Sequence, residues 1–183
     1  MATKKYAVVK KKQLAKMKNW HYPVTTTLEE MRMSGWKLYI YGKTIEHSLE
    51  ICKRVAPLAQ KYNVTMKVAS QAIIDRNTAN DNIVWSAGVI YLRPELFAAK
   101  TASKLVRDIN NSLIGYNERG AIRGAKALNP KIHYRYDLTE PVDPKVGVTY
   151  QKYVTLYRGE EGDYNIPRNM DIGKLLTSSE KLV

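Results

Sequence analysis

The chain has 183 residues, of which 44% are hydrophobic, so it is long enough for one globular domain with a single core. It holds 30 Lys and Arg against 17 Asp and Glu, and the formal net charge of +13 favours an anionic partner such as nucleic acid, a phosphoprotein or a membrane surface. Cys52 is the one cysteine, which excludes an internal disulfide and is typical of a reducing compartment. No apolar run reaches the roughly 18 residues of a membrane span, so we expect a cytoplasmic basic protein without a membrane segment.

Residues 1–18 form a basic N-terminal arm that holds seven lysines and no acid. The arm supplies about half of the net charge, and charge blocks of this kind are commonly solvated tails. Since no apolar core follows it, we do not expect a secretory signal. The remaining residues, 19–183, are expected to form a single domain.

The first half of the chain is predicted to alternate helices with strands. After an irregular lead-in, Thr27 and the acids that follow it predict a short helix that ends at Gly35. Residues 36–41 alternate aromatic and aliphatic side chains in the way that is typical of a strand. Residues 45–61 carry apolar residues at helical spacing, and Pro57 predicts a kink or an early end within that helix.

The second half is predicted to end in strands that follow one another without helices between them. The predicted elements are a strand over 64–68, a helical turn and loop over 70–82, a strand over 83–92, a helix over 95–114, a basic loop over 119–124, a strand over 132–136 and a strand over 150–157. Gly88 predicts a bulge in the most apolar of these strands, and Pro94 opens the longest helix. This order favours an α+β fold with a twisted, partly antiparallel sheet and flanking helices.

Several kinds of site are absent from the sequence. There is no GxxxxGK or GxGxxG phosphate loop, no GxSxG nucleophile elbow and no basis for a Ser-His-Asp triad. The histidines His21, His47 and His133 are widely spaced, and together with Cys52 they do not make a metal site. We therefore expect no metal and no cofactor.

Lys37 and Lys67 each interrupt a short apolar strand. Because residues two apart share a strand face, Lys37 is expected to project with Tyr39, and His133 with Arg135. The pattern allows two interpretations. The lysines either lie on the solvent-exposed face of a sheet that is covered on one side only, or they converge on a site.

Four segments that occur in order carry a family resemblance. They are Gly35-Trp36-Lys37-Leu38-Tyr39, Met66-Lys67-Val68-Ala69, Gly88-Val89-Ile90-Tyr91-Leu92-Arg93-Pro94-Glu95 and Ile132-His133-Tyr134-Arg135-Tyr136. Over about residues 34–137 the chain resembles the lyase-like N-terminal region of class III lanthipeptide synthetases and, more remotely, the phosphothreonine lyases that bacterial pathogens inject into host cells. The resemblance implies a phosphothreonine lyase-like fold and the elimination of phosphate from phosphothreonine or phosphoserine without a cofactor.

The resemblance also implies roles for individual residues. Lys67 is similar to the family's base, Lys37 to the cation that stabilises the enolate-like charge, and Tyr91 to the active-site tyrosine. The arginines that it assigns to phosphate binding are Arg135, Arg76 as a poorer match, Arg158 and Arg168.

One position departs from the family pattern. The family's general acid is a histidine two residues after the first lysine, and here that residue is Tyr39. The pKa of a phenol is ordinarily about 10 and that of an imidazole about 6.5, so a tyrosine is the weaker proton donor at neutral pH. His133 is able to replace the histidine if it faces the same pocket.

Three functions follow from these observations and stay open. The first is a carbon–oxygen lyase acting on phosphothreonine or phosphoserine in a peptide or protein. The second is a catalytically impaired pseudo-lyase that serves as a phosphoprotein-binding or inhibitory module. The third is a nucleic-acid-binding protein that uses the N-terminal lysines, since basic charge and aromatic residues are typical of such proteins.

Overall fold

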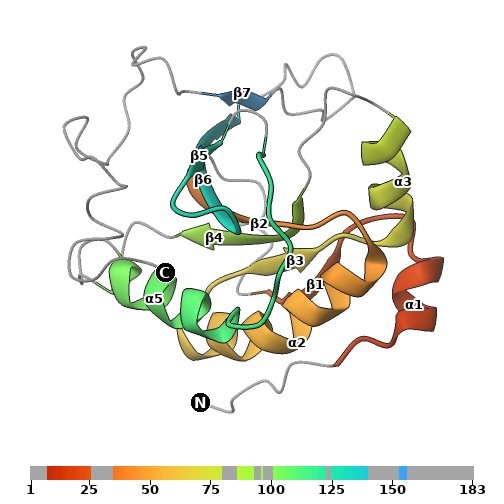
Figure 1. Cartoon of the computed structure of the whole chain (residues 1–183), viewed down its shortest axis with the longest axis horizontal. Coiled ribbons are helices and arrows are strands. Elements are labelled where there is room, and N and C mark those ends of the chain that lie inside the picture. Colours follow the sequence, from red (N-terminus) through yellow and green to blue (C-terminus); the bar gives the residue numbers. More distant parts are fainter. Residues whose placement is uncertain are drawn as a thin grey trace, which may run out of the picture.

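A computed structural model describes residues 8–25, 35–79, 86–92, 96, 101–122, 125–139 and 153–155. The strands in these ranges are β1 (His21–Val24), β2 (Gly35–Tyr41), β3 (Met66–Val68), β4 (Ser86–Leu92), β5 (Lys126–Ala127), β6 (Ile132–Thr139) and β7 (Tyr153–Thr155). The helices are α1 (Lys11–Lys16), α2 (Ile45–Lys61), α3 (Gln71–Ala79) and α5 (Ala102–Ser112). The strands form one sheet in the order β1-β3-β4-β2-β6-β5, with β7 paired to β6 (Figure 1).

The strand pairs in the described ranges are all antiparallel, which confirms the predicted α+β class. At the centre, β2 pairs with β4 on one side and with β6 on the other. Its alternating side chains place Leu38 and Ile40 in one buried cluster and Tyr39 and Tyr41 in a second cluster on the opposite face. The strand predicted over 36–41 is therefore confirmed.

The helices α1, α2, α3 and α5 of the described ranges contribute to the larger of these two clusters, on one face of the sheet. In Figure 1, α2 and α5 lie side by side beneath the strands. Ile51 of α2 and Leu105 and Ile109 of α5 are fully buried there. Full burial of each such side chain stabilises the fold by about 1.5–3 kcal/mol relative to exposure.

Gly88 of β4 allows α2 to approach the sheet closely. A Cβ atom at this position would lie 2.7 Å from Cγ2 of Ile51. The pairing of β4 with β2 shifts register between Ile40 and Tyr41, next to Gly88. The irregularity predicted at this glycine is thus present, and the close contact with α2 explains the residue.

Helix α2 has the bounds that the sequence predicted. Thr44 precedes it, and its Oγ1 accepts a hydrogen bond of 3.2 Å from the backbone N–H of His47. The early end predicted at Pro57 is wrong, since the helix continues to Lys61. Pro57 lies on the exposed side, and the buried side of the last turns, which includes Ala59, keeps its contacts with the core.

The helix predicted over 95–114 is shorter in the structure. Leu96 is helical, but α5 itself begins at Ala102. Thr101 explains the interruption, because its backbone N–H and its hydroxyl both donate to the Leu96 carbonyl, at 2.8 and 3.2 Å. The helix predicted before Gly35 lies outside the described residues.

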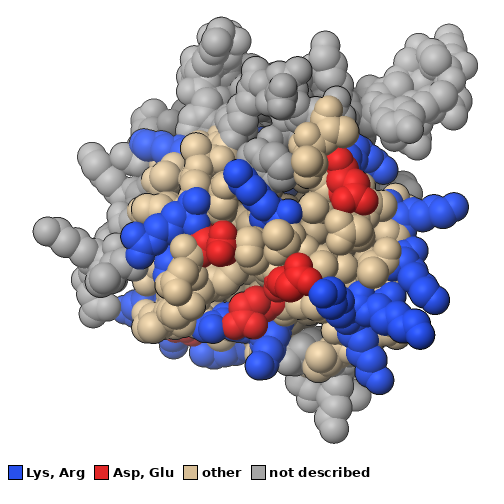
Figure 2. All heavy atoms as spheres, turned by 45° about the vertical axis from the view of Figure 1, so that its right-hand side comes forward, with Lys and Arg blue, Asp and Glu red and all other residues tan. Residues whose placement is uncertain are grey.

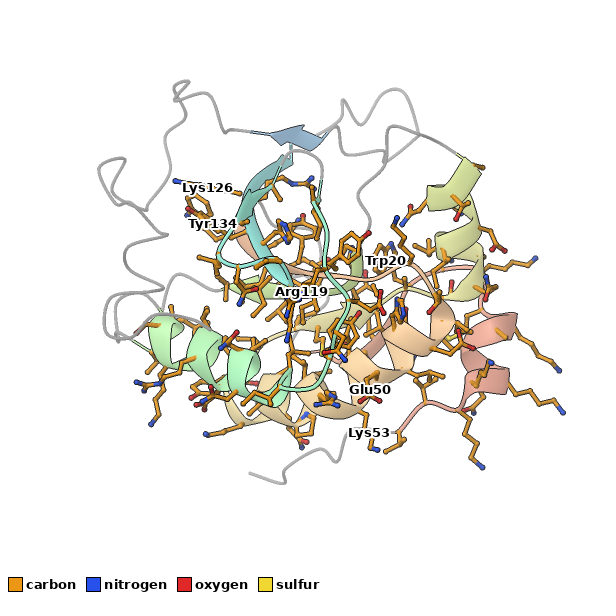
Figure 3. The ribbon with its side chains drawn as sticks, viewed as in Figure 1. Trp20, Glu50, Lys53, Arg119, Lys126 and Tyr134 are labelled. Carbon is orange, nitrogen blue, oxygen red and sulfur yellow. The ribbon has the colours of Figure 1, made fainter. Side chains whose placement is uncertain are left out.

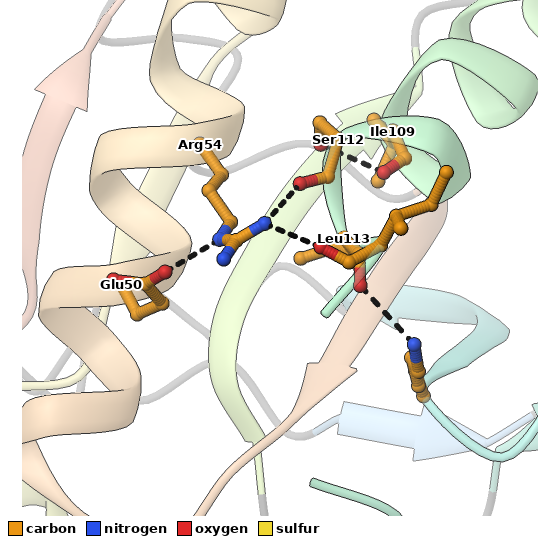
Figure 4. Close-up of polar contacts among 7 residues, drawn as sticks. Glu50, Arg54, Ile109, Ser112 and Leu113 are labelled. Atoms are coloured by element: carbon orange, nitrogen blue, oxygen red, sulfur yellow. Dashed lines mark hydrogen bonds and ion pairs between the residues drawn. The ribbon is translucent and has the colours of Figure 1, made fainter. Parts of the chain in front are cut away.

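Two cations cap the C-terminal end of α5. Nη1 of Arg54 donates to the carbonyls of Ser112 and Ile114 at 2.9 and 2.7 Å, while Nε of the same guanidinium contacts Glu50 at 2.6 Å (Figure 4). Nζ of Lys131 donates to the Leu113 carbonyl at 3.1 Å. Positive charges stabilise the carbonyl end of a helix, so these contacts fix α5 to α2 and to the start of β6.

Part of the predicted basic arm is folded against the domain. Residues 11–16 form α1, whose Leu14 is fully buried in the main core. The arm is therefore not a solvated tail over residues 8–18. No helix among the residues described is long and apolar enough to cross a membrane.

Candidate cationic site on the open face of the sheet

The face of the sheet opposite the helices brings together predicted site residues from four strands. Lys37 pairs with Tyr91 of β4 and with Arg135 of β6, and Tyr39 pairs with His133. Residues that pair directly in antiparallel strands project on the same side, so these five side chains share one face. Val89 of β4, which belongs to the same buried cluster as Tyr39 and Tyr91, also pairs with Lys67 and places it on this face.

Aromatic rings hold the two lysines. Nζ of Lys37 lies 5.1 Å and Nζ of Lys67 lies 5.6 Å from the centroid of the Tyr91 ring. Lys67 also lies 4.5 Å from the ring of Trp20, which precedes β1 (Figure 3). Each such cation–π contact contributes about 0.5–2 kcal/mol, depending on how far water is excluded. Two ammonium groups from different strands therefore meet at one ring.

We call this side of the sheet the open face because no described helix contributes to its buried cluster, although its side chains are largely shielded from water. Lys37 is 4% exposed and Tyr91 is 6% exposed, whereas Lys67 and Arg135 are half-buried. Lys37 pairs directly with Arg135 across β2 and β6, which brings two positive charges close together. Positive charge gathered in this way attracts anions.

Arg135 is held against Tyr39. Its Nη2 donates to the Tyr39 hydroxyl oxygen at 2.8 Å, and its Cζ lies 4.7 Å from the centroid of that ring. A charge-assisted hydrogen bond to a phenol oxygen stabilises the negative charge that would remain after the phenol gave up its proton. This contact therefore joins two of the residues that the sequence predicted for the site, one from β2 and one from β6.

His133 is buried beneath a loop. Burial lowers the pKa of His133, and a hydrogen bond to the Gly120 backbone acts in the opposite direction. The ring is 3% exposed, and its Nδ1 has no hydrogen-bond partner among the described residues. The imidazole is consequently neutral at neutral pH, and in that form it is a poor proton donor.

The loop over residues 116–122 covers the end of this face that carries Tyr41. The hydroxyl of Tyr116 donates to the Tyr41 carbonyl at 2.6 Å, and Ile122 packs in the cluster with Tyr41. A Cβ atom at Gly120 would lie 2.3 Å from the Tyr41 ring, so a larger residue there would require the ring to move. Figure 3 shows the loop, marked by Arg119, crossing the sheet.

The other predicted residues are not part of the buried cluster as described. Arg76 lies in the last turn of α3 with an exposed side chain. Arg158 and Arg168 lie outside the described residues. Trp20 was not recognised from the sequence, because the segment before β1 was predicted to be irregular and no face could be assigned to it.

Other reactive groups in the described ranges do not form a second site. No group of three His, Cys, Asp or Glu residues there is able to hold a metal ion. Burial raises the pKa of the Cys52 thiol to about 11, so it is not a nucleophile at neutral pH.

No protein-family model matches the chain, and no curated protein matches it in sequence. The chemistry of the open face therefore rests on its own residues. Three cations and two phenols gather over a small area of one sheet face. Such a set suits the binding of a phosphate dianion, with groups beside it that are able to accept and donate protons.

Proposed function

We propose that this chain is a phosphothreonine lyase-like protein that binds a phosphorylated threonine or serine side chain of a peptide or protein on the open face. The observation that carries the proposal is the meeting of Lys37 and Lys67, 5.1 and 5.6 Å from one Tyr91 ring, with Arg135 opposite Lys37. The antiparallel sheet with helices on one face agrees with the coarse class that the resemblance implies.

The proposed reaction is β-elimination. Lys67 first gives up its own proton to water and then, as a neutral amine, takes the α-proton, and the electron pair of the broken C–H bond forms the Cα=Cβ double bond. The Cβ–O bond breaks, and phosphate leaves with its electron pair and takes up a proton. Lys37 stabilises the negative charge that develops on the substrate carbonyl oxygen. The products are a dehydroamino acid and inorganic phosphate, with no redox change and no cofactor.

Tyr39 is the proposed proton donor to the leaving phosphate. Its hydrogen bond from Arg135 supports this role, because the guanidinium stabilises the phenolate that results. His133 is assigned to positioning, since its ring is neutral at neutral pH and is bonded to the loop at Gly120.

A second candidate function is phosphoprotein binding without elimination. It is favoured by the absence of an imidazolium donor, since Tyr39 occupies the family's histidine position and burial lowers the pKa of His133. In this pseudo-lyase the same cations bind the phosphorylated side chain, but the leaving group is not protonated.

One assay distinguishes the lyase from the pseudo-lyase. Phosphothreonine and phosphoserine peptides are incubated with the protein and with Lys67→Met, beside unphosphorylated peptides. Phosphate release with the matching loss of mass, abolished in Lys67→Met, establishes the lyase. Phosphate-dependent binding without loss of mass establishes the pseudo-lyase. Binding that does not depend on the phosphate contradicts both.

The Tyr39→His variant tests the assignment of the proton donor. If the pseudo-lyase is correct and only the acid is missing, the variant gains elimination activity that the parent lacks. If the lyase is correct and Tyr39 is the donor, Tyr39→Phe loses activity, and Tyr39→His moves the alkaline limb of the pH–rate profile down toward neutral pH, because a general acid must be protonated to act.

A further inference from the structure

Helix α1 and the residues beside it are fixed on the domain. Leu14 is fully buried, and Val9 and Met17 pack against the same core. Lys11 forms an ion pair with Glu46 at the start of α2. These contacts attach the segment at its two ends and in its middle, so its side chains are presented from a defined backbone.

Four lysines of this segment point to solvent. They are Lys10, Lys12, Lys16 and Lys18, which are all exposed, and no ion pair joins them to a described residue. Lys12 and Lys16 lie four residues apart on the helix, where two like charges are destabilising by about 0.2–0.5 kcal/mol. Figure 2, in which the side that carries α1 comes forward, shows Lys and Arg side chains crowded at its lower right. An anionic partner would remove this repulsion.

The composition of the surface limits what that partner is. The large apolar side chains of residues 10–18, Leu14 and Met17, pack against the core, so no apolar face is left to enter a membrane. The segment has no aromatic residue and no arginine, which are the usual anchors of a protein–protein interface. Lysines alone on a fixed backbone suit a regular row of phosphates.

We propose that residues 10–18 form a nucleic-acid-binding surface that contacts the phosphates of a duplex without reading its bases. The surface lies on a segment packed against the helix side of the sheet, so it is separate from the cationic site on the open face. It goes beyond the proposed phosphopeptide function and does not depend on it.

The test is the salt dependence of binding to a fluorescently labelled duplex DNA. Four phosphate contacts give a slope of log K against log salt of about −3.6, so affinity should fall about 100-fold between roughly 50 and 200 mM salt. Replacing Lys12 and Lys16 by Gln should reduce the slope to about −1.8. The matched control replaces the exposed Lys104 and Lys126 by Gln, which lowers the net charge equally and should leave the slope unchanged.

The variant does not lose binding through unfolding, because removing the Lys12–Lys16 repulsion should not lower the melting temperature. Three results would overturn the proposal. The first is an equal loss of slope in variant and control, which shows that only net charge matters. The second is equal affinity for a poly-glutamate peptide or for phosphatidylserine vesicles. The third is no binding of the parent protein to DNA at low salt.

Discussion

The two faces of the central sheet are built from the same strands and hold different kinds of residue. On the helix face, β2 presents Leu38 and Ile40 to a continuous apolar core. On the open face, the alternate residues of β2 are Lys37 and Tyr39, surrounded by cations and phenols. Burying an ammonium group costs hydration, which the cation–π contact with Tyr91 offsets in part. One face thus holds the apolar core, and the other holds the charged groups on which the proposed ligand site rests.

The largest effect is expected from a cavity on the helix face. Leu38→Ala should lower the free energy of unfolding by about 2–5 kcal/mol, because the side chain of Leu38 is fully buried in the core on the helix side of the sheet. Urea denaturation measures the loss. Ile40→Val, which removes one methyl group from the same face, should cost only about 0.5–1.5 kcal/mol. Equal losses in the two variants would contradict the account of this core.

The next largest losses of stability are expected from replacing a glycine on each face by alanine. Gly120→Ala on the open face should cost about 1–3 kcal/mol, since a Cβ atom there would lie 2.3 Å from the buried Tyr41 ring. Gly88→Ala on the helix face would place a Cβ atom 2.7 Å from Cγ2 of Ile51, a fully buried β-branched side chain, so a loss of similar size is expected there. The thermal midpoints of the two variants measure the losses.

Lys37→Met should separate stability from binding. The substitution keeps the volume of the side chain. It removes both the cation–π contact with Tyr91 and the like charge opposite Arg135, which act in opposite directions, so the free energy of unfolding should change by no more than about 1 kcal/mol. Binding of a phosphothreonine peptide should weaken about 10- to 100-fold, which corresponds to the loss of one charged hydrogen bond. Isothermal titration with the phosphorylated and unphosphorylated peptides measures it. A large loss of stability would show that the lysine serves the fold.

The sequence predicted those features of the two faces that depend on residues close together in the chain. The alternation in β2 and the helical spacing in α2 depend on neighbouring residues, and both elements were predicted correctly. Strands β1 and β5 were missed, because β1 has only four residues including Pro23 and β5 has two, so pairing with other strands creates them. Periodicity placed Lys37 beside Tyr39 but did not join them to Lys67 or Arg135. That neighbourhood depends on the register between distant segments, which only the ordered set of motifs suggested.

The smallest expected effect is a pH dependence that comes from buried histidines. Burial lowers the folded-state pKa of His133 and of His21 below 6.5, so as pH falls the unfolded chain takes up protons before the folded one does. The stability that this difference provides is fully present above pH 6.5 and is lost as pH falls toward the folded-state pKa, by at most about 1.4 kcal/mol per pH unit and group. His133→Gln should make the free energy of unfolding less dependent on pH between about 7 and 5, and adding His21→Gln should reduce the dependence further.

Adding a phosphorylated ligand tests whether the pKa of His133 responds to binding on the open face. A dianion bound near Lys37 and Arg135 would favour the protonated form of His133, so its pKa should rise when a phosphothreonine peptide is added. The imidazole signals of the protein with and without the peptide report that change. His21 belongs to β1, which is separated from β2 by β3 and β4, so its signal should shift less and serves as the comparison. A shift confined to His133 would tie the ligand to the open face, whereas equal shifts in both would point to a general effect of charge.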